Sequence, residues 1–268
     1  MILKGKRGLI MGVANDKSIA WGIAKACAAQ GAELGFTYQG EVFKKRVEPL
    51  VASIGGSKVI VECDVTNESA IDTTFAEIKK LWGNFDFLVH AVAYSNKEEL
   101  KGRYCDTTLE NFLNSLHISC YSFTSVARRA AAMMPKGGSM LTLSYIGSER
   151  VIPNYNVMGV AKAALEASVR YLAGDFGANN IRVHGLSAGP MKTLAGSAIA
   201  NARYTFRTAE QTAALNRSVT LEDIGNTAVY LLSDMSSGTS GEMHYVDAGF
   251  RCMGMLPPGR IAAETDVE

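Results

Sequence analysis

The sequence predicts an α/β fold: a doubly wound sheet of about seven parallel strands in a single domain. Seven short β-rich runs alternate with segments of helical periodicity along the chain. Most of these runs are nearly continuous in apolar residues, which is typical of parallel strands covered by helices on both faces. The regular alternation indicates right-handed strand–helix–strand crossovers.

Each element is assigned from its own run of residues. The expected strands are 7–14, 33–39, 58–65, 85–93, 138–146, 181–189 and 244–249. The expected helices are 18–30, 41–54, 68–82, 107–134, 154–178 and 220–232. No Pro/Ser-rich linker, low-complexity tract or internal repeat divides the chain, so we expect one domain over residues 1–252.

One segment, 190–219, lacks strand character and interrupts the alternation just after the sixth strand. Open α/β sheets bind their ligands at the carboxyl ends of strands. We therefore expect 190–219 to be a helical lid that covers a substrate. The alternative is an ordinary pair of surface helices. The tail, 253–268, contains the Pro, Gly and acidic residues that are typical of partly disordered segments.

Composition excludes several classes of protein. Of 268 residues, 47% are apolar, and 27 basic residues stand against 26 acidic ones, so the chain is neither a disordered protein nor a basic nucleic-acid platform. No apolar run approaches the ~18 residues that a membrane helix needs. The N-terminal apolar stretch is not followed by a signal-peptide cleavage site. We expect a cytoplasmic protein that binds neither membrane nor nucleic acid.

The cysteines and histidines show no ligand spacing. The five cysteines are scattered without a C-x-x-C pair, which predicts free thiols in a reducing compartment. The four histidines are equally dispersed. The sequence therefore predicts no metal site.

The turn after the first strand is suited to a dinucleotide. Small residues at Gly12 and Ala14 would let backbone N–H groups approach a pyrophosphate at a helix N-terminus. Ser18 is a candidate helix N-cap and phosphate donor. The turn does not match G-x-G-x-x-G, so a capped strand–helix turn without a ligand is an equal alternative on this segment alone.

The next two strand ends bear on the choice of nucleotide. Gln39 ends the second strand, and no Arg stands directly at that turn to receive a 2′-phosphate, which favours NADH over NADPH. Lys44 and its basic neighbours are one turn further and are expected on a solvated helix face. Asp64, at the end of the third strand, is a candidate partner for the adenine amino group. Its alternative role is a helix N-cap.

The strongest chemical signal is a tyrosine–lysine pair after the fifth strand. Tyr155 and Lys162 are seven residues apart, which places them on one face of a helix. An ammonium beside a phenol favours its ionised form and its hydrogen bonds to developing negative charge. Such a lysine can also hold the ribose hydroxyls of a nicotinamide cofactor. The alternative is a partly buried Tyr beside a snorkelling Lys.

With these segments in view, the chain resembles the short-chain dehydrogenases/reductases, whose fold is of the Rossmann type. More narrowly, it resembles the NADH-dependent enoyl-[acyl-carrier-protein] reductases of bacterial type II fatty acid synthesis. The resemblance covers residues 5–250 and is carried by GVANDKSIAWGIA, GAELGFTYQ, CDVTNESAID, TLSYIGSERVIPNYNVMGVAKAALEASVRYLA, SAGPMKTLA and SGEMHYVDAG. The spacing of Tyr145, Tyr155 and Lys162 together with SAGPMKTLA is specific to that family.

The resemblance implies roles for individual residues. It places the pyrophosphate at Gly12, Ser18 and Ile19, the adenosine at Gln39, Asp64 and Val65, and the nicotinamide with its ribose and phosphate at Val92, Lys162, Met191, Lys192, Thr193, Leu194 and Ala195. Tyr145, Tyr155 and Ser95 would face the substrate thioester. It further implies NADH as cofactor, an acyl carrier protein that bears the substrate, and a homotetramer.

The implied reaction transfers hydride from NADH to the β-carbon of a trans-2-enoyl thioester, the last reductive step of the elongation cycle. Tyr155 would stabilise the enolate oxygen, an effect of ~3–4 kcal/mol for one preorganised donor. Lys162 would position cofactor and phenol, and Tyr145 would line the thioester pocket. Arg203, Arg207 and Lys192 are candidate contacts for the acidic carrier, or else solvated surface charges.

Three other activities are weighed against this one. A carbonyl or 3-oxoacyl reductase would need a hydroxyl thirteen residues before the tyrosine, where Thr142 stands, with Ser144 close by. A serine hydrolase is suggested by G-x-S-x-G around Ser187, but Pro190 disfavours the helix that must follow a nucleophile elbow. A regulator that binds the cofactor without catalysis is disfavoured because both Tyr155 and Lys162 are present.

Overall fold

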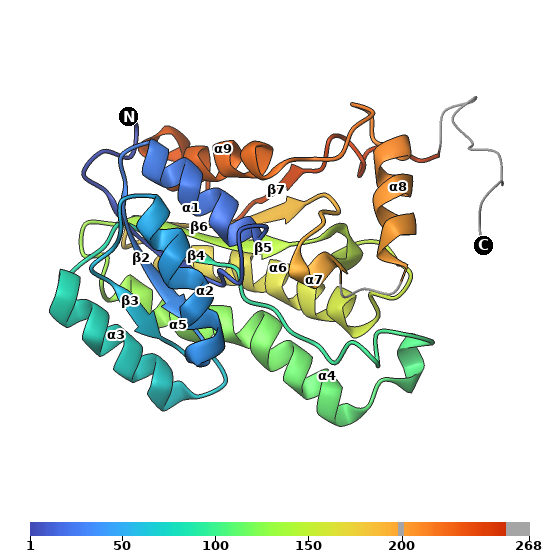
Figure 1. The fold of residues 1–268 in the computed structure, drawn as a ribbon, viewed down its shortest axis with the longest axis horizontal. Helices are drawn as coiled ribbons and strands as arrows, with labels where there is room; N and C mark the ends of the chain where they lie inside the picture. The colour runs from blue at the N-terminus through green and yellow to red at the C-terminus, as the bar shows by residue number, and fades with distance from the viewer. Residues whose placement is uncertain (198–200, 256–268) are drawn as a thin grey trace.

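The seven strands form a single parallel sheet (Figure 1). The computed structural model describes residues 1–197 and 201–255. The strands are β1 (Arg7–Met11), β2 (Glu33–Tyr38), β3 (Ile60–Glu62), β4 (Phe87–His90), β5 (Gly138–Ser144), β6 (Ile181–Ala188) and β7 (Met243–Val246). Their order in the sheet is β3-β2-β1-β4-β5-β6-β7. The predicted fold class and strand set are confirmed, although most strands are shorter than their apolar runs.

Between β3 and β4 the chain crosses from one edge of the sheet back to its middle, so β1 pairs with both β2 and β4. The strand order therefore reverses between β1 and β4. In open α/β sheets, this switch point opens a crevice at the carboxyl ends of the strands.

Helices cover both faces of the sheet. The long helices are α1 (Ile19–Ala29), α2 (Gly40–Ser53), α3 (Glu68–Trp82), α4 (Leu109–Leu116), α5 (Ser122–Ala131), α6 (Val157–Gly177), α8 (Ala202–Thr212) and α9 (Leu221–Leu232). Apolar residues of α1, α2 and α9 pack on one face, and those of α3, α5 and α6 pack on the other. In Figure 1, α1 and α9 lie side by side along one face of the sheet.

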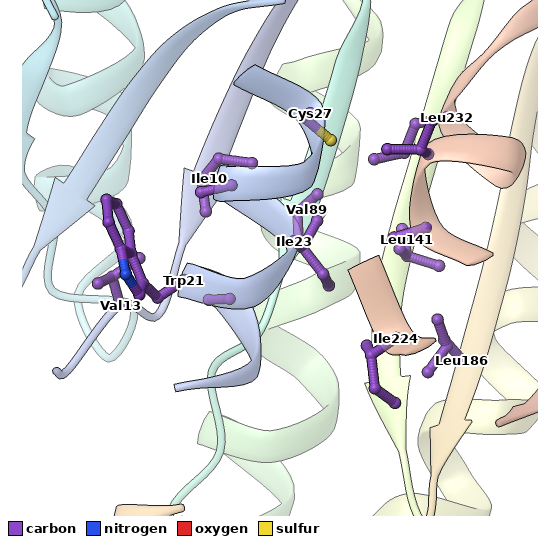
Figure 2. Packing of buried hydrophobic residues seen from close by; sticks show 14 of the residues in the cluster. Ile10, Val13, Trp21, Ile23, Cys27, Val89, Leu141, Leu186, Ile224 and Leu232 are labelled. Atoms are coloured by element: carbon purple, nitrogen blue, oxygen red, sulfur yellow. The ribbon is translucent and has the colours of Figure 1, made fainter. Parts of the chain in front are cut away.

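Alternate residues of each strand point to opposite faces, and this divides the core in two. Ile10 packs under α1 and α9, while its neighbours Leu9 and Met11 face α3, α5 and α6. All three are fully buried. Figure 2 shows the first of these cores, where strand and helix residues meet: Ile10, Val13, Trp21, Ile23, Cys27, Val89, Leu141, Leu186, Ile224 and Leu232.

The helix predicted over 107–134 is confirmed as an unbroken helical run from Leu109 to Ala131, but it contains a π-turn that was not predicted. The segment is α4, a π-helical turn η2 (His117–Tyr121), and α5. In this region Ser119 turns its hydroxyl to the loop after β4, where it accepts from Tyr94 N and donates to Tyr94 O, both at 3.0 Å. A π-turn inserts one residue and so changes which side chains face the loop. Helical periodicity alone does not register such an insertion.

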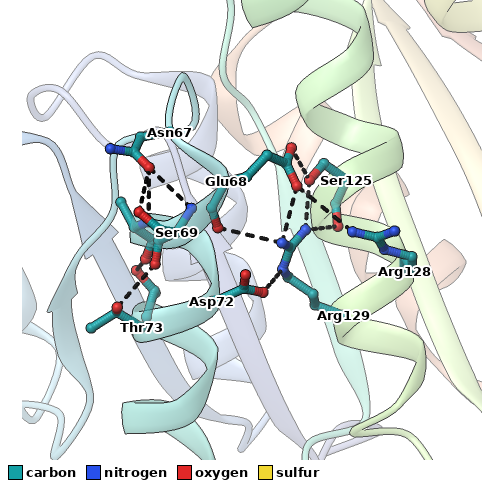
Figure 3. Close-up of polar contacts among 10 residues, drawn as sticks. Asn67, Glu68, Ser69, Asp72, Thr73, Ser125, Arg128 and Arg129 are labelled. Carbon is teal, nitrogen blue, oxygen red and sulfur yellow. Dashed lines mark hydrogen bonds and ion pairs between the residues drawn. The ribbon is translucent and has the colours of Figure 1, made fainter.

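A cluster of polar contacts, the α3–α5 clasp, joins helix α3 to helix α5 (Figure 3). The guanidinium of Arg129, which is only 11% exposed, contacts Asp72 at 2.6 Å and Glu68 at 3.0 Å. It also donates to Ser125 O at 3.0 Å. Asn67 caps α3 by accepting from the amides of the first turn.

No helix in the described part of the chain is long and apolar enough to span a membrane.

Candidate active site

A cavity of about 520 Å³ opens at the switch point between β1 and β4. Its walls come from the carboxyl ends of the first four strands and from the loops that follow them. Four predicted cofactor residues lie on these walls together: Gly12, Gln39, Val65 and Val92. The lining residues include neither Lys nor Arg in the described part of the chain.

Gly12 occupies a place that no other residue fits. Its φ is +96°, in the region that favours glycine, and a β-carbon there would overlap the backbone carbonyl of Ala91 after β4. The first amides of α1 follow within a few residues and have no partners inside the helix. These features suit the close approach of a pyrophosphate to the backbone, so the residues present fit a dinucleotide.

The structure corrects one part of the prediction for Ser18, its capping hydrogen bond. Ser18 does stand at the N-cap position of α1, but its side chain makes no capping hydrogen bond to the helix. Its hydroxyl instead accepts from Ala14 N and Asn15 N, both at 3.0 Å. Ser18 therefore shapes the turn that precedes the helix. The amides that open the first helical turn, beginning at Ile19, remain candidate phosphate donors.

At the ends of β2 and β3, Asp64 does not cap α3, because Asn67 does. The Asp64 carboxylate instead accepts from Thr66 N and Oγ1, at 2.9 and 2.7 Å. Burial by itself would raise the pKa of Asp64, but hydrogen bonds from Thr66 and Gln39 outweigh it and hold this pKa below its ordinary value. An ionised carboxylate that accepts from Gln39 suits the recognition of an adenosine.

Lys44 lies closer to this strand end than a solvated helix face would place it. Its ammonium is 5.8 Å from the centre of the Tyr38 ring and 3.5 Å from Glu41 Oε1. The cation is thus already paired with an acid and an aromatic ring.

The tyrosine–lysine pair is buried where β5 meets α6. Tyr155 and Lys162 are 8% and 6% exposed. The rings of Tyr145 and Tyr155 meet edge to face, with centroids 4.9 Å apart. Lys162 Nζ donates to Leu143 O at 2.7 Å. Among residues 1–197 and 201–255, neither phenol hydroxyl has a hydrogen-bond partner, so both are available to a substrate.

The backbone on either side of Tyr155 is strained. Asn154 and Asn156 both have positive φ angles, 61° and 38°. Asn156 is held by its side-chain amide, which donates to Leu100 O at 3.1 Å. Such strain persists only where the surrounding contacts enforce it, and it is concentrated at functional positions.

The pKa values correct the expected effect of Lys162 on the phenol. Burial raises the pKa of Tyr155 well above its ordinary value, and electrostatic interactions with Tyr145 and Glu166 add to this. Burial likewise raises the pKa of Tyr145 to about 12. Burial lowers the pKa of Lys162 to about 8. Desolvation dominates, and the Lys162 ammonium is not among the groups that shift the pKa of Tyr155, so Tyr155 is a neutral hydrogen-bond donor rather than a phenolate.

Comparison with known proteins bears directly on this site. A family model described as enoyl-(acyl carrier protein) reductase matches residues 12–251. The chain belongs to the enoyl-[acyl-carrier-protein] reductase family. It is 58% identical over 254 residues to the enoyl-[acyl-carrier-protein] reductase [NADH] 2 of Rhizobium meliloti, with 95% of this chain and 94% of that relative covered.

Other relatives agree with this assignment. The enoyl-[acyl-carrier-protein] reductase [NADH] FabI of Rickettsia prowazekii is 56% identical over 253 residues, which cover 94% of this chain and 97% of the relative. The crystal structure of the Anaplasma phagocytophilum reductase in complex with NAD superposes with a TM-score of 0.93 at 56% identity, covering 96% of this chain and 98% of the other.

The residues weighed for other activities are not placed to perform them. Thr142 is buried within β5 and donates to His90 O at 3.1 Å, while Ser144 donates to Glu166. Neither hydroxyl is free to meet a substrate carbonyl as a carbonyl reductase requires. Ser187 is 1% exposed inside β6, which does not turn into a helix after it, so the G-x-S-x-G match is accidental.

Ser95 lies in the loop after β4, but its hydroxyl is already engaged. It accepts from Ser115 at 2.8 Å and donates to the buried Asn111 at 3.3 Å. Asn111 also accepts from Asn96 N at 3.0 Å. These contacts attach the loop to α4 and place Ser95 as a residue that holds the loop.

The predicted lid, 190–219, contains two helices, α7 (Leu194–Ser197) and α8. Met191 packs against the core beneath α1 and α9. Thr193 Oγ1 accepts from Gly196 N at 3.0 Å and so starts α7. Residues 198–200, the side chain of Ala195, and 256–268 of the tail lie outside the described residues.

In the part that is described, no three His, Cys, Asp or Glu side chains are grouped so as to hold a metal ion.

A second cavity, of about 910 Å³, lies under α8. Four cationic side chains line it: Lys17, Lys192, Arg203 and Arg207. Glu210 is the only acid among its described lining residues. The cavity is therefore suited to an anionic ligand.

Sequence reasoning missed one group at the site, the buried carboxylate of Glu166 on α6. Glu166 is 7% exposed and accepts hydrogen bonds from Ser144 and Ser148. Its spacing of four residues from Lys162 was a usable signal, because this places both on one face of the helix.

Proposed function

We propose that this protein reduces the trans-2 double bond of enoyl-[acyl-carrier-protein] thioesters with NADH, and that Tyr155 is the group that hydrogen-bonds the thioester oxygen. The observation that carries this proposal is the edge-to-face pair of protonated phenols of Tyr145 and Tyr155, which have no hydrogen-bond partner among the described residues, together with the buried Lys162 of α6. Family membership supports the same reaction.

The chain's own residues bind and orient the reactants. Bound NADH supplies the hydride for the β-carbon. As negative charge builds on the thioester oxygen, Tyr155 donates a hydrogen bond from a site that excludes water, an effect of ~3–4 kcal/mol. Its raised pKa keeps the proton on the phenol while it does so. Tyr145, edge to face with Tyr155, lines the thioester pocket and is the candidate donor of the proton to the α-carbon.

Lys162 binds the cofactor ribose. An ammonium has three N–H donors, and Leu143 O accepts one of them. The other two can hold the ribose hydroxyls. His90, also buried nearby, adds no competing charge, because burial and then the charge of Lys162 lower its pKa to about 3.

The cofactor cleft favours NADH. The absence of Lys and Arg from the described lining of the 520 Å³ cavity leaves no cation on its walls for a 2′-phosphate. Gln39 and Val65 would lie against the adenosine, and Val92 against the nicotinamide ribose.

NADH oxidation with a trans-2-enoyl thioester tests the reaction. Tyr155→Phe should lower kcat about 10²–10³-fold, since it removes the donor to the developing oxyanion. Tyr230→Phe, on the outer helix α9, is the matched control and should retain wild-type turnover. Reduction of 3-oxoacyl but not enoyl thioesters would contradict the proposal, and so would full activity in Tyr155→Phe.

The lid and the cavity beneath it are proposed to receive the acyl carrier protein, whose surface is acidic. The four cations that line the 910 Å³ cavity support this role. Reversal of both charges, Arg203→Glu with Arg207→Glu, should raise KM for the carrier-bound substrate and leave KM for a small enoyl thioester unchanged. An unchanged KM for the carrier-bound substrate would remove the proposal.

We also propose a homotetramer in the cytoplasm. Leu109 and Leu113, four residues apart on α4, are 72% and 58% exposed, and Tyr171 on α6 is equally uncovered. Such apolar surface is typical of subunit contacts. Light scattering should report four chains, and a monomer would contradict the assignment. All five cysteines are free, which suits a reducing compartment.

A further inference from the structure

Glu166 is a buried carboxylate on the helix that carries Lys162, and it has no role in the steps of the proposed reaction. It lies on α6 four residues after Lys162, so both side chains leave the same face of the helix. No Lys or Arg forms an ion pair with it within residues 1–197 and 201–255. A buried charge without a direct ion pair is costly, so its retention calls for a compensating contact or role.

Its hydrogen bonds supply the contact. Ser144 Oγ and Ser148 Oγ both donate to Glu166 Oε1, at 2.5 and 2.6 Å. Ser144 is the last residue of β5, and Ser148 is the last residue of the short 3₁₀ turn η3 (Ile146–Ser148). These two serines bracket Tyr145. One carboxylate oxygen thus ties both ends of the turn that carries Tyr145 to the helix that carries Lys162.

The turn and the helix are in close contact along this seam. A β-carbon at Gly159 of α6 would lie 2.6 Å from Gly147 O, and one at Gly147 would overlap the Tyr155 ring. The edge-to-face geometry of Tyr145 and Tyr155 therefore depends on the seating of η3, that is, the position in which it packs against α6. The Glu166 hydrogen bonds are polar contacts that fix this seating.

We propose that Glu166 is a positioning residue of this reductase: it seats the Tyr145 turn against the Tyr155–Lys162 helix and supplies the buried negative charge that stabilises the Lys162 ammonium. The proposal rests on the proposed function, because it concerns the geometry and charge of that same site. Glu166 acts through Tyr145 and Lys162 and does not itself contact the substrate.

The phenol of Tyr155 is neutral, and three described ionisable groups interact electrostatically with Lys162. These are His90 on β4, Cys120 on η2, and Glu166 on α6 itself. Burial lowers the pKa of Lys162, while Cys120 and Glu166 oppose this effect. His90 is neutral because burial lowers its pKa to about 3. Removal of the Glu166 charge should therefore lower the pKa of Lys162 further.

The test compares three variants in the full-length enzyme. Glu166→Gln keeps the shape and an acceptor oxygen but removes the charge. Ser148→Ala keeps the charge but removes one of the two seating hydrogen bonds. Asp175→Asn removes an exposed negative charge from the same helix and serves as the matched control.

The first readout is the protonation of the Lys162 ammonium, which ¹⁵N-lysine NMR monitors in a pH titration of the cofactor-free protein. The Kd of NADH is measured in parallel from pH 6 to 9.5. Wild type should show a break near pH 8 in both. Glu166→Gln should move this break down by about one pH unit. Ser148→Ala and Asp175→Asn should leave it in place.

The second readout is turnover of an enoyl thioester. Ser148→Ala should lower kcat several-fold with little change in the KM for NADH, because it disturbs the Tyr145 turn and not the lysine. Asp175→Asn should match wild type. An unchanged break in Glu166→Gln overturns the charge role. An unchanged kcat in Ser148→Ala overturns the seating role, and this variant gives that answer even where Glu166→Gln does not fold. Failure of wild type to bind NADH at any pH would instead contradict the proposed function.

Discussion

Replacement of Lys162 by methionine should make the free protein more stable at neutral pH while it abolishes activity. Methionine has nearly the length of lysine and carries no charge. The wild-type ammonium is 6% exposed, and burial lowers its pKa from the ordinary 10.5 to about 8. The protein therefore maintains this charge at the expense of its stability, as expected of a residue kept for function.

The size of the effect follows from the two pKa values. The difference between 10.5 and about 8 corresponds to ~3 kcal/mol of destabilisation when lysine is charged in both the folded and unfolded states. The variant also loses the hydrogen bond to Leu143 O, a cost of about 1 kcal/mol. Lys162→Met should thus gain ~2 kcal/mol at pH 7.

The dependence on pH has a definite sign. Because the folded pKa is depressed, the cost is fully present below pH 8. Between pH 8 and 10.5 the unfolded chain binds more protons than the folded one, so wild-type stability rises relative to the variant. The advantage of Lys162→Met should shrink to about zero at pH ~10 and reverse above it, since the lost hydrogen bond to Leu143 O remains.

Urea unfolding at fixed protein concentration, from pH 7 to 9.5, measures this difference. Lys25→Met, at an exposed position on α1, is the control and should stay within ~0.5 kcal/mol of wild type throughout. A Lys162→Met variant that is less stable than wild type at pH 7 would refute the reasoning. A stability difference independent of pH would refute it equally.

Two further predictions concern the cofactor turn and the α3–α5 clasp. Gly12→Ala should weaken NADH binding by about tenfold or more in fluorescence titration, because the added methyl group would overlap Ala91 O. The control is Gly40→Ala, which also lies at positive φ but has open space around it, and it should bind NADH normally. Equal losses of affinity in the two variants would contradict this prediction. Arg129→Gln should lower the free energy of unfolding by ~2 kcal/mol, because the variant loses hydrogen bonds, including the one to Ser125 O. Its kcat should not change. Urea unfolding measures the difference, and an unaltered midpoint would contradict the prediction.

Much of the site could be predicted from local sequence because its signals are local. The spacing of Tyr155 and Lys162 is a property of one helix, and the glycine at position 12 reflects one turn. Strand ends could be located from apolar runs, and parallel strands bring their carboxyl ends to one edge of the sheet. This is why Gly12, Gln39 and Val65 could be expected in one cleft.

The features that were not predicted are hydrogen bonds that compete for a side chain. Ser18 is an N-cap residue by type, yet the amides of the preceding turn take its hydroxyl. The helix expected over 107–134 contains a π-turn, whose Ser119 bonds to Tyr94, 25 residues away. Residue type and helical periodicity alone do not indicate either partner.

By itself, then, the sequence determined the seven-stranded doubly wound sheet, the family resemblance, and the identity of the tyrosine–lysine pair, since each depends on residue type at short spacing. The tertiary structure decided the protonation of that pair and the place of Glu166. Desolvation depends on every element packed around a group, so the burial that keeps Tyr155 protonated and lowers the pKa of Lys162 exists only in the folded chain.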